Sequence, residues 1–201
     1  MNRLTLFAML LVCATSAQAA PETYVIDASQ TASLFSYRTL GLPSLTHRFE
    51  RIRGRMVFDL TAGTGSADVT IDATSVNTGQ ATLDTKIQNA DFFDTANHPA
   101  ITFKSTRMTL DGDQPSLAGL LTIKGVTKPV TLALSNFHCM QDPNFKVDAC
   151  GARATVTVKR SDFNMGKYAF LISDEITLSL AFRAVKQDAY IQVASRDPMQ
   201  Q

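Results

Sequence analysis

The sequence is poor in the residues from which catalytic and metal centres are usually built. Its 201 residues contain three histidines, three cysteines and no tryptophan. His47, His98 and His138 form no His-x-His or His-x-x-x-His pair, so a metal site would require three separate loops to converge. No serine lies in a Gly-x-Ser-x-Gly elbow. The sequence therefore argues against an enzyme and predicts neither a metal nor a cofactor.

An excess of one charge and a second long apolar run are also missing. Lys and Arg together number 19 and Asp and Glu 18, and the basic residues form no block. Nucleic acids and anionic membrane surfaces are recognised by clustered basic residues, so we expect no nucleic-acid partner. After residue 19 no apolar run approaches the roughly 18 residues that span a bilayer, so we expect a soluble chain without a membrane span.

The first 19 residues have the features of a secretory signal. Arg3 supplies a basic start, residues 4–12 form an apolar run, and Ala17-Gln18-Ala19 is a small-residue cleavage site. The sequence therefore predicts a periplasmic protein that begins at Ala20 and consists of one domain over residues 20–201, with a core at about 24–185 and a short C-terminal tail.

The cysteines predict one disulfide bond. Removal of the signal takes away Cys13 and leaves Cys139 and Cys150 as an even pair in an oxidising compartment. A turn signal at residues 142–144 would bring the two together, and closing a loop of this size is worth about 3 kcal/mol in the chain-entropy model. Lipidation of Cys13 is the competing interpretation, but Val12 is a poor residue before a lipidated cysteine.

Hydrophobic residues recur at every second position in most of the chain. Within residues 175–184, for example, Ile176, Leu178, Leu180 and Phe182 share one face, which is the strand pattern. The same period, together with Gly, Pro, Asn or Asp at the boundaries, predicts further strands. They lie at residues 24–27, 33–39, 54–60, 67–73, 101–104, 116–123, 130–135 and 152–159.

One short helix is expected among these strands. Leu83 and Ile87 lie four residues apart within residues 81–90, on one helical face. Strands that follow each other without crossover helices pair antiparallel, and a sheet of eight or nine such strands protects its edges by closing into a barrel or folding into a sandwich. The pattern thus predicts an all-β fold and leaves both arrangements open.

Several motifs in a fixed order resemble one known family. They are VNTGQATLDTKIQNADFFDTANHPAITFKST at residues 76–106, LAGLLTIKGVTKPVTLAL at 117–134 and VKRSDFNMGKYAFLISDEITLSLAFRA at 158–184. With Ile26-Asp27, Phe35 and Gly54-Arg55-Met56-Val57-Phe58 before them, they resemble the YceI-like family of bacterial secreted proteins over residues 24–185. The resemblance implies a lipocalin-like antiparallel up-and-down β-barrel of about eight strands, whose apolar interior holds a polyisoprenoid or another amphiphilic lipid.

The chain departs from the family at four positions. Where relatives often carry histidine, this sequence has Gln30, Thr39 and Lys86, and Leu83 stands where relatives have the arginine of an Arg-Asp-x-His-Leu stretch. If those histidines contact a ligand head group in relatives, the head-group preference differs here. Binding of an apolar tail does not depend on them.

Adjacent Phe92 and Phe93 cannot share one face of a strand, so we expect them in a turn that covers the open end of the barrel. A small cluster beneath a loop is the alternative. Basic residues such as Lys86, Lys124, Lys128, Arg160 and Lys167 are candidates for the rim, although such residues more often lie in solvated turns. The expected cavity lining comprises Phe35, Phe58, Ile71, Phe92, Phe93, Phe103, Leu121, Leu132, Phe163, Met165, Leu171, Leu178 and Leu180.

From these features the sequence predicts a periplasmic carrier that encloses the long apolar tail of an amphiphilic lipid, such as a polyisoprenoid or a quinone-type lipid, without covalent chemistry. Homodimer formation stays open. The alternative is a structural or stress-related secreted barrel that is filled by its own side chains and acts through its surface. A lipid hydrolase or isomerase is a third hypothesis, for which the sequence offers no residue constellation.

Overall fold

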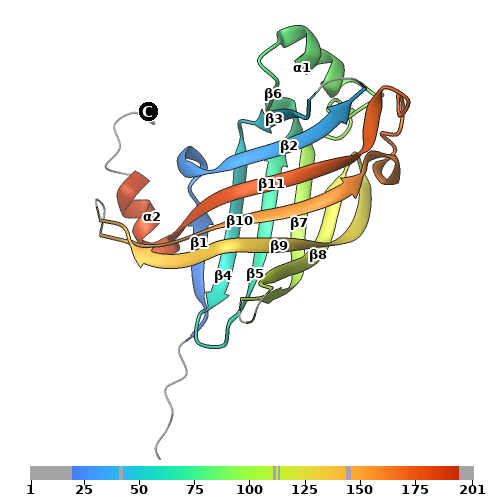
Figure 1. The fold of residues 1–201 in the computed structure, drawn as a ribbon. Helices are drawn as coiled ribbons and strands as arrows, with labels where there is room; N and C mark the ends of the chain where they lie inside the picture. Colours follow the sequence, from blue (N-terminus) through green and yellow to red (C-terminus); the bar gives the residue numbers. More distant parts are fainter. Residues whose placement is uncertain (1–19, 41–42, 111, 113, 144–145, 195–201) are drawn as a thin grey trace, which may run out of the picture.

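The chain forms a closed antiparallel barrel with short strands and a helix added at one end (Figure 1). The structure is a computed structural model and describes residues 20–40, 43–110, 112, 114–143 and 146–194, so the expected signal segment lies outside the described residues. The strands are β1 (Glu22–Ile26), β2 (Ala32–Thr39), β3 (Leu45–Phe49), β4 (Ile52–Asp59), β5 (Thr64–Asp72), β6 (Val76–Asn77), β7 (Ala100–Thr109), β8 (Ser116–Ile123), β9 (Val126–Gln141), β10 (Asp148–Lys159) and β11 (Ile172–Lys186). The helices are α1 (Ala81–Gln88) and α2 (Gln187–Ala194), with 3-10 turns η1 (Ala28–Gln30), η2 (Ala73–Ser75) and η3 (Arg160–Phe163).

Eight strands close the barrel in the order β1-β4-β5-β7-β8-β9-β10-β11, and β11 pairs back to β1. From β4 onwards each strand of the barrel lies beside the next one in the chain, which is the up-and-down arrangement. Strand β11 pairs with β1 through residues 184–186 and with β2 through residues 172–181. Strands β3 and β6 continue the sheet beyond β2. The expected antiparallel barrel of about eight strands is confirmed.

Three elements were not expected from the sequence. Strand β3 is only five residues long and includes His47 and Arg48, and β6 has two residues, so neither gives a clear alternating pattern. Helix α2 follows β11 directly, and no Gly, Pro or N-capping residue at Lys186 or Gln187 marks its start. The expected short helix at residues 81–90 is present as α1.

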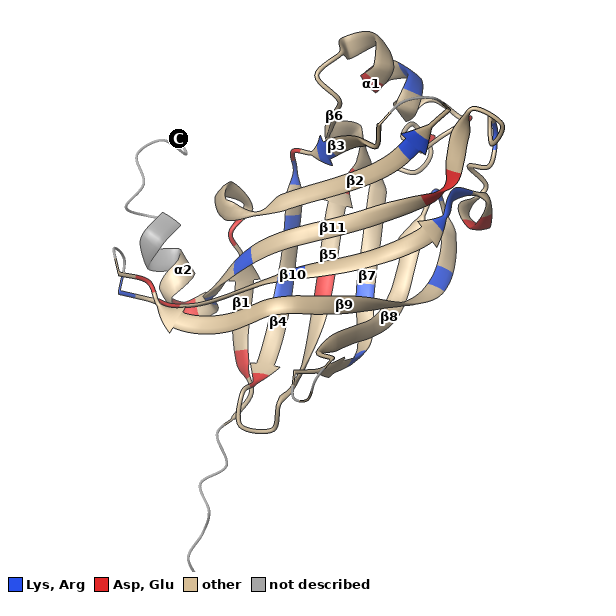
Figure 2. Ribbon diagram, in the orientation of Figure 1, with Lys and Arg blue, Asp and Glu red and all other residues tan. Residues whose placement is uncertain are grey.

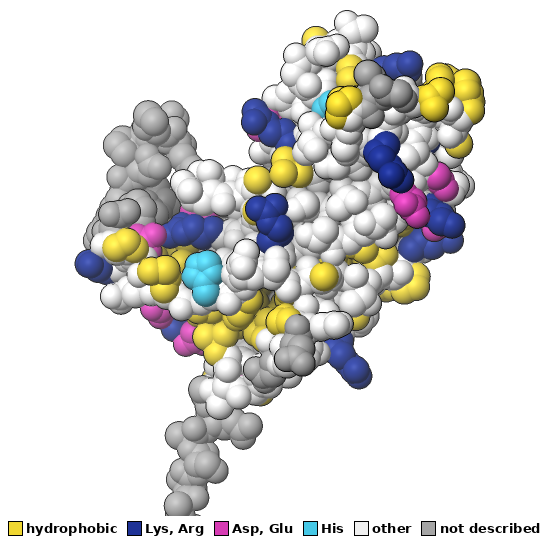
Figure 3. All heavy atoms as spheres, in the orientation of Figure 1, with side chains coloured by type: hydrophobic (Ala, Val, Ile, Leu, Met, Phe, Trp, Pro, Cys, Tyr) yellow, Lys and Arg dark blue, Asp and Glu magenta, His cyan; other side chains and the backbone are white. Residues whose placement is uncertain are grey.

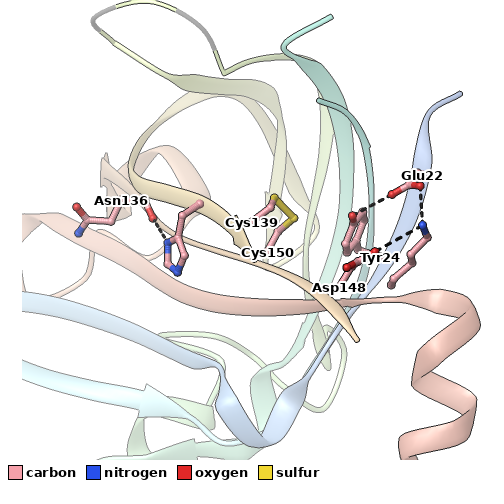
Figure 4. Close-up of a disulfide and its surroundings, with 8 residues drawn as sticks. Glu22, Tyr24, Asn136, Cys139, Asp148 and Cys150 are labelled. Carbon is pink, nitrogen blue, oxygen red and sulfur yellow. Dashed lines mark hydrogen bonds and ion pairs between the residues drawn. A yellow bond between two sulfur atoms is a disulfide. The ribbon is translucent and has the colours of Figure 1, made fainter. Parts of the chain in front are cut away.

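The disulfide between Cys139 and Cys150 is present and joins β9 to β10 (Figure 4). The two cysteines lie directly opposite each other in the strand register. On the neighbouring wall the Tyr24 hydroxyl donates to Glu22, and Tyr24 packs on Phe58 at a ring-centroid distance of 5.2 Å. Burial is the largest cause that raises the pKa of Tyr24 to about 12, and the hydrogen bond to Glu22 is the second. This end of the barrel is therefore tied both covalently and by packed rings.

Charged residues are interspersed along the barrel and at its loops (Figure 2). On the face shown in Figure 3, basic and acidic side chains lie in small mixed groups. Within the described residues, no helix is long and apolar enough to cross a membrane.

Candidate ligand-binding site

The interior of the barrel contains an apolar cavity of about 80 Å³, which we call the barrel cavity. Of its nineteen lining residues, only Ser33 and Ser179 carry polar side chains. The alternation expected for β11 explains this composition, because Leu178, Leu180 and Phe182 face inward together. The other lining residues are Leu34, Phe49, Met56, Val69, Ile71, Phe93, Ile101, Phe103, Leu117, Leu121, Ile123, Leu132, Ala154 and Val156.

A second cavity of about 90 Å³ lies beneath α1 and is called the helix-end cavity. Helix α1 turns Leu83 and Ile87 toward it, as their spacing of four residues requires. Unlike the barrel cavity, it is also lined by a phenol and two cationic side chains. Its lining comprises Phe35, Tyr37, Leu83, Lys86, Ile87, Phe92, Phe93, Arg160, Met165, Ile172 and Ile176.

Phe93 lines both cavities and stands between them. Its ring makes T-shaped contacts with Phe35 and Phe49, at centroid distances of 5.9 and 5.4 Å. Its backbone N–H donates to the carbonyl of Ile87, so the end of α1 holds it in place. The Phe93 side chain is therefore a wall that the two cavities share.

Phe92 points to the rim, where it stacks on Tyr168 at a centroid distance of 6.0 Å. Lys86 and Lys167 lie over the same Tyr168 ring, at 5.5 and 5.3 Å from its centroid. Lys167 also pairs with Asp91 at 2.7 Å, which lowers the pKa of the Asp91 carboxyl and raises that of Lys167. The double phenylalanine thus places one ring between the cavities and the other at the rim.

Arg160 is a buried cation at the wall of the helix-end cavity, with 4% of its surface exposed. Its guanidinium donates to four backbone carbonyls, those of Met165, Lys167, Ile172 and Ser173. Burial lowers the pKa of Arg160, against the opposing influence of Asp174 and Tyr37. The side chain therefore holds the loop between η3 and β11 in shape and brings a positive charge to an otherwise mostly apolar space.

His47 is the buried histidine of this end. Its Nε2 lies 3.1 Å from the Tyr37 hydroxyl, and its ring lies 5.5 Å from that of Phe35. Burial lowers the pKa of His47, partly offset by Asp84. The pair of Tyr37 and His47 is the polar edge of an aromatic cluster.

The structure brings most of the expected lining residues to the two cavities. Ile71, Phe93, Phe103, Leu121, Leu132, Leu178 and Leu180 line the barrel cavity, and Phe35, Phe92, Phe93 and Met165 line the helix-end cavity. Phe58, Phe163 and Leu171 lie outside both.

These three positions correct the sequence interpretation. Phe58 is buried at the disulfide end between Tyr24 and Phe137. Phe163 is buried in η3 and lines a groove on the outside of the barrel. Leu171 is 47% exposed in the loop before β11. Alternation could not place Phe163 and Leu171, because both lie outside strands.

Sequence reasoning missed Tyr37 and His47, and it placed Arg160 at a solvated rim. A buried arginine bound by carbonyls of its own loop leaves no signal in the spacing of the sequence. Among the described residues, no three His, Cys, Asp or Glu side chains gather where they could hold a metal ion.

The fold and its cavities define a closed, lipocalin-like β-barrel with an apolar interior. The sequence profile of the YceI-like domain matches residues 24–184, and the chain belongs to this family. Protein YceI of Escherichia coli O157:H7 is 35% identical over 184 residues, which cover 90% of this chain and 95% of that protein.

Solved structures share the fold. BcnA of Burkholderia cenocepacia is similar with a TM-score of 0.69 at 24% identity, covering 79% of this chain and 98% of that one. A polyisoprenoid-binding domain from Saccharophagus degradans, implicated in plant cell wall breakdown, gives a TM-score of 0.57 at 19% identity, covering 81% and 98%.

Proposed function

We propose that this protein is a periplasmic carrier that shields the apolar tail of an amphiphilic lipid, of the polyisoprenoid or quinone type, inside its barrel. The observation that carries the proposal is the mostly apolar interior on both sides of Phe93, in which the cationic side chains and the phenol line only the helix-end cavity. The polyisoprenoid-binding neighbour of the same fold supports the choice of ligand class. Residues 1–19 and the disulfide support export.

A long tail requires side chains of the interior to move. Cavities of about 80 and 90 Å³ are smaller than the 300 to 1,000 Å³ that is usual for ligand pockets. Each buried methylene contributes about 0.8 kcal/mol, so ten contribute about 8 kcal/mol before ordering costs. Separating Phe93 from Phe35 and Phe49 costs about 1–3 kcal/mol, at 0.5–1.5 kcal/mol for each aromatic pair. Burial of the tail therefore outweighs displacement of the ring.

The head group is proposed to lie in the helix-end cavity. Arg160, the Tyr37 hydroxyl and Lys86 all line this cavity, whereas the barrel cavity offers only two serine side chains. A cation and a phenol suit a phosphate or a quinone carbonyl, since both accept hydrogen bonds. The tail would then extend past Phe93 into the barrel cavity.

The small cavity volumes favour a second candidate, a secreted barrel that is filled by its own side chains and acts through its surface. The two candidates differ in one respect that can be measured. The carrier takes up an apolar tail with its fold intact, whereas the filled barrel does not.

Binding of a farnesyl-tailed fluorescent probe by the purified protein tests the proposal. The informative pair of variants is Leu121→Asp and Leu120→Asp, because these neighbours on β8 face opposite sides of the wall. Leu121 lines the barrel cavity and Leu120 is 44% exposed. We expect Leu121→Asp to abolish binding and Leu120→Asp to retain it.

A buried carboxylate can also unfold the chain, so circular dichroism accompanies the titration, and Leu178→Phe provides a second variant. That substitution fills the barrel cavity with a ring and introduces no charge. Loss of binding by folded Leu178→Phe supports the carrier. Unchanged binding by both inward variants, or no binding by the unaltered protein, rejects it.

A further inference from the structure

Strands β9 and β10 are neighbours in the barrel but pair along only part of their length. Their register runs from Asp148↔Gln141 to Thr155↔Ala133. Beyond that point β9 continues to pair with β8, from Leu132 back to Val126, and β10 continues to pair with β11 as far as Lys159. In the described part of the chain no register pair joins residues 126–132 to residues 156–159. We call this stretch the open seam.

A groove of about 650 Å³ lies along the open seam. One wall is residues 128–131 of β9, the other is residues 156–159 of β10, and Asp162, Phe163 and Glu175 complete it. Lys128, Lys159, Asp162 and Glu175 carry two positive and two negative charges, so the groove has no excess charge. Pro129 lies on β9 here, as is typical of a strand that is locally an edge.

Side chains rather than backbone hydrogen bonds separate this groove from the interior. Val156 lines both the groove and the barrel cavity. Phe163, 1% exposed, belongs to η3, which packs against both β9 and β10. Phe163 therefore lies at the groove beside the stretch where the two strands do not pair.

We propose that the open seam is the lateral entrance through which a lipid tail reaches the barrel cavity, with Phe163 as its movable plug. This inference rests on the proposed function, since it names the route of that ligand. A tail entering through paired strands would leave several backbone donors and acceptors unsatisfied, whereas the open seam requires only side-chain rotation.

The helix end is a less direct route to the same space. A tail that starts beneath α1 must pass the stacked Phe92 and Tyr168 and then displace Phe93 before it reaches the barrel cavity. At the open seam Val156 lines both the groove and the barrel cavity, so only this side chain and the Phe163 plug need to move. The charged residues at the edges of the groove also disfavour its other use, the addition of a strand from a second protein.

The test closes the open seam and measures the rate of uptake. In Thr131→Cys/Thr157→Cys, one exposed position on each wall of the groove is available to a short bifunctional thiol reagent. The matched control is Ser135→Cys/Arg153→Cys, two exposed positions that already face each other in the paired half of the same strands. A third pair, Lys86→Cys/Tyr168→Cys, closes the helix end. The probe is a farnesyl chain that carries a dansyl group, and its uptake is measured by stopped-flow fluorescence.

We expect closure of the open seam to slow association by about tenfold or more, and the control cross-link to leave it within about twofold. Phe163→Leu, a smaller plug, is expected to speed both uptake and release. An unchanged rate after seam closure, or slowing only after helix-end closure, overturns the lateral entrance while leaving the proposed function standing. Absence of probe binding by the unaltered protein overturns the function and the entrance together.

Discussion

The two halves of the β9–β10 pair show how differently one wall of this barrel is built. In one half the strands pair in register and Cys139 is bonded to Cys150. In the other half they run beside each other without pairing, and the buried Phe163 lies at the groove along this stretch.

The two ends of the barrel also differ in how they are held together. Near the disulfide, Arg183 pairs with Asp27 and Asp142, and Lys186 pairs with Glu22. At the opposite end the helix-end cavity is enclosed by aromatic rings and by a loop that Arg160 holds. The disulfide end is therefore fixed by a covalent bond, ion pairs and packed rings, whereas the helix end is enclosed by aromatic rings, the Lys167–Asp91 ion pair and the hydrogen bonds of Arg160. A container for a bulky guest requires this combination, because the guest must enter without unfolding the chain.

The largest expected effect is on the fixed end. Phe58→Ala removes a ring that is 1% exposed and packs on Tyr24 and Phe137. We expect the free energy of unfolding to fall by about 3–5 kcal/mol, the usual range for a buried phenylalanine. Urea denaturation of the variant and the unaltered chain measures this loss of unfolding free energy. A loss below about 1 kcal/mol would show that this end is not rigidly packed.

Loss of the disulfide should come next. Replacing Cys139 and Cys150 by serine or alanine is expected to cost about 3 kcal/mol, because the bond closes a loop with a sequence separation of 11. Comparison of urea midpoints with and without reductant checks the value in the unaltered chain. Equal midpoints would mean that strand pairing alone fixes this half of the wall.

A local effect is expected at the helix end. Arg160→Met leaves four backbone carbonyls without their guanidinium donor, at a cost of about 1–3 kcal/mol. Hydrogen exchange followed by mass spectrometry should show faster exchange within residues 161–173 and little change around the disulfide. Lys159→Met, one residue earlier and exposed, is the control. Equal exchange in the two variants would contradict the role given to Arg160.

The smallest expected effect is a pH dependence. Burial lowers the pKa of His47 below its ordinary value of about 6.5. At pH values just below 6.5, His47 therefore binds a proton more readily in the unfolded chain than in the folded chain. The free energy of unfolding therefore falls as the pH falls from 7 to about 5.5, above the range in which carboxylates titrate. His47→Gln should flatten this slope in denaturation series. An identical slope in the variant would assign the effect to other groups.

Much of this architecture could be predicted because its causes are periodic. The alternation in residues 175–184 predicted the inward face of β11, and that of Val130, Leu132 and Leu134 predicted β9. The even pair of cysteines predicted the disulfide. Each of these features is local in the chain, so the pattern of the sequence records it.

The features that distinguish the two ends could not be predicted, because they depend on contacts between distant segments. Phe163 and Phe58 are equally apolar in the sequence, yet one lies at the open seam and the other packs at the disulfide end. The point at which β9 and β10 cease to pair lies beyond Ala133 and Thr155. It has no marker in either strand apart from Pro129.

The most direct test of the central claim is organic extraction of the protein isolated from its native host. Mass spectrometry of the extract then measures the amount of lipid per protein chain. The account predicts about one long-tailed lipid per chain, retained by the unaltered protein and lost from folded Leu178→Phe. A lipid-free protein that also refuses a farnesyl-tailed probe in solution would contradict it and would identify the barrel as one filled by its own side chains.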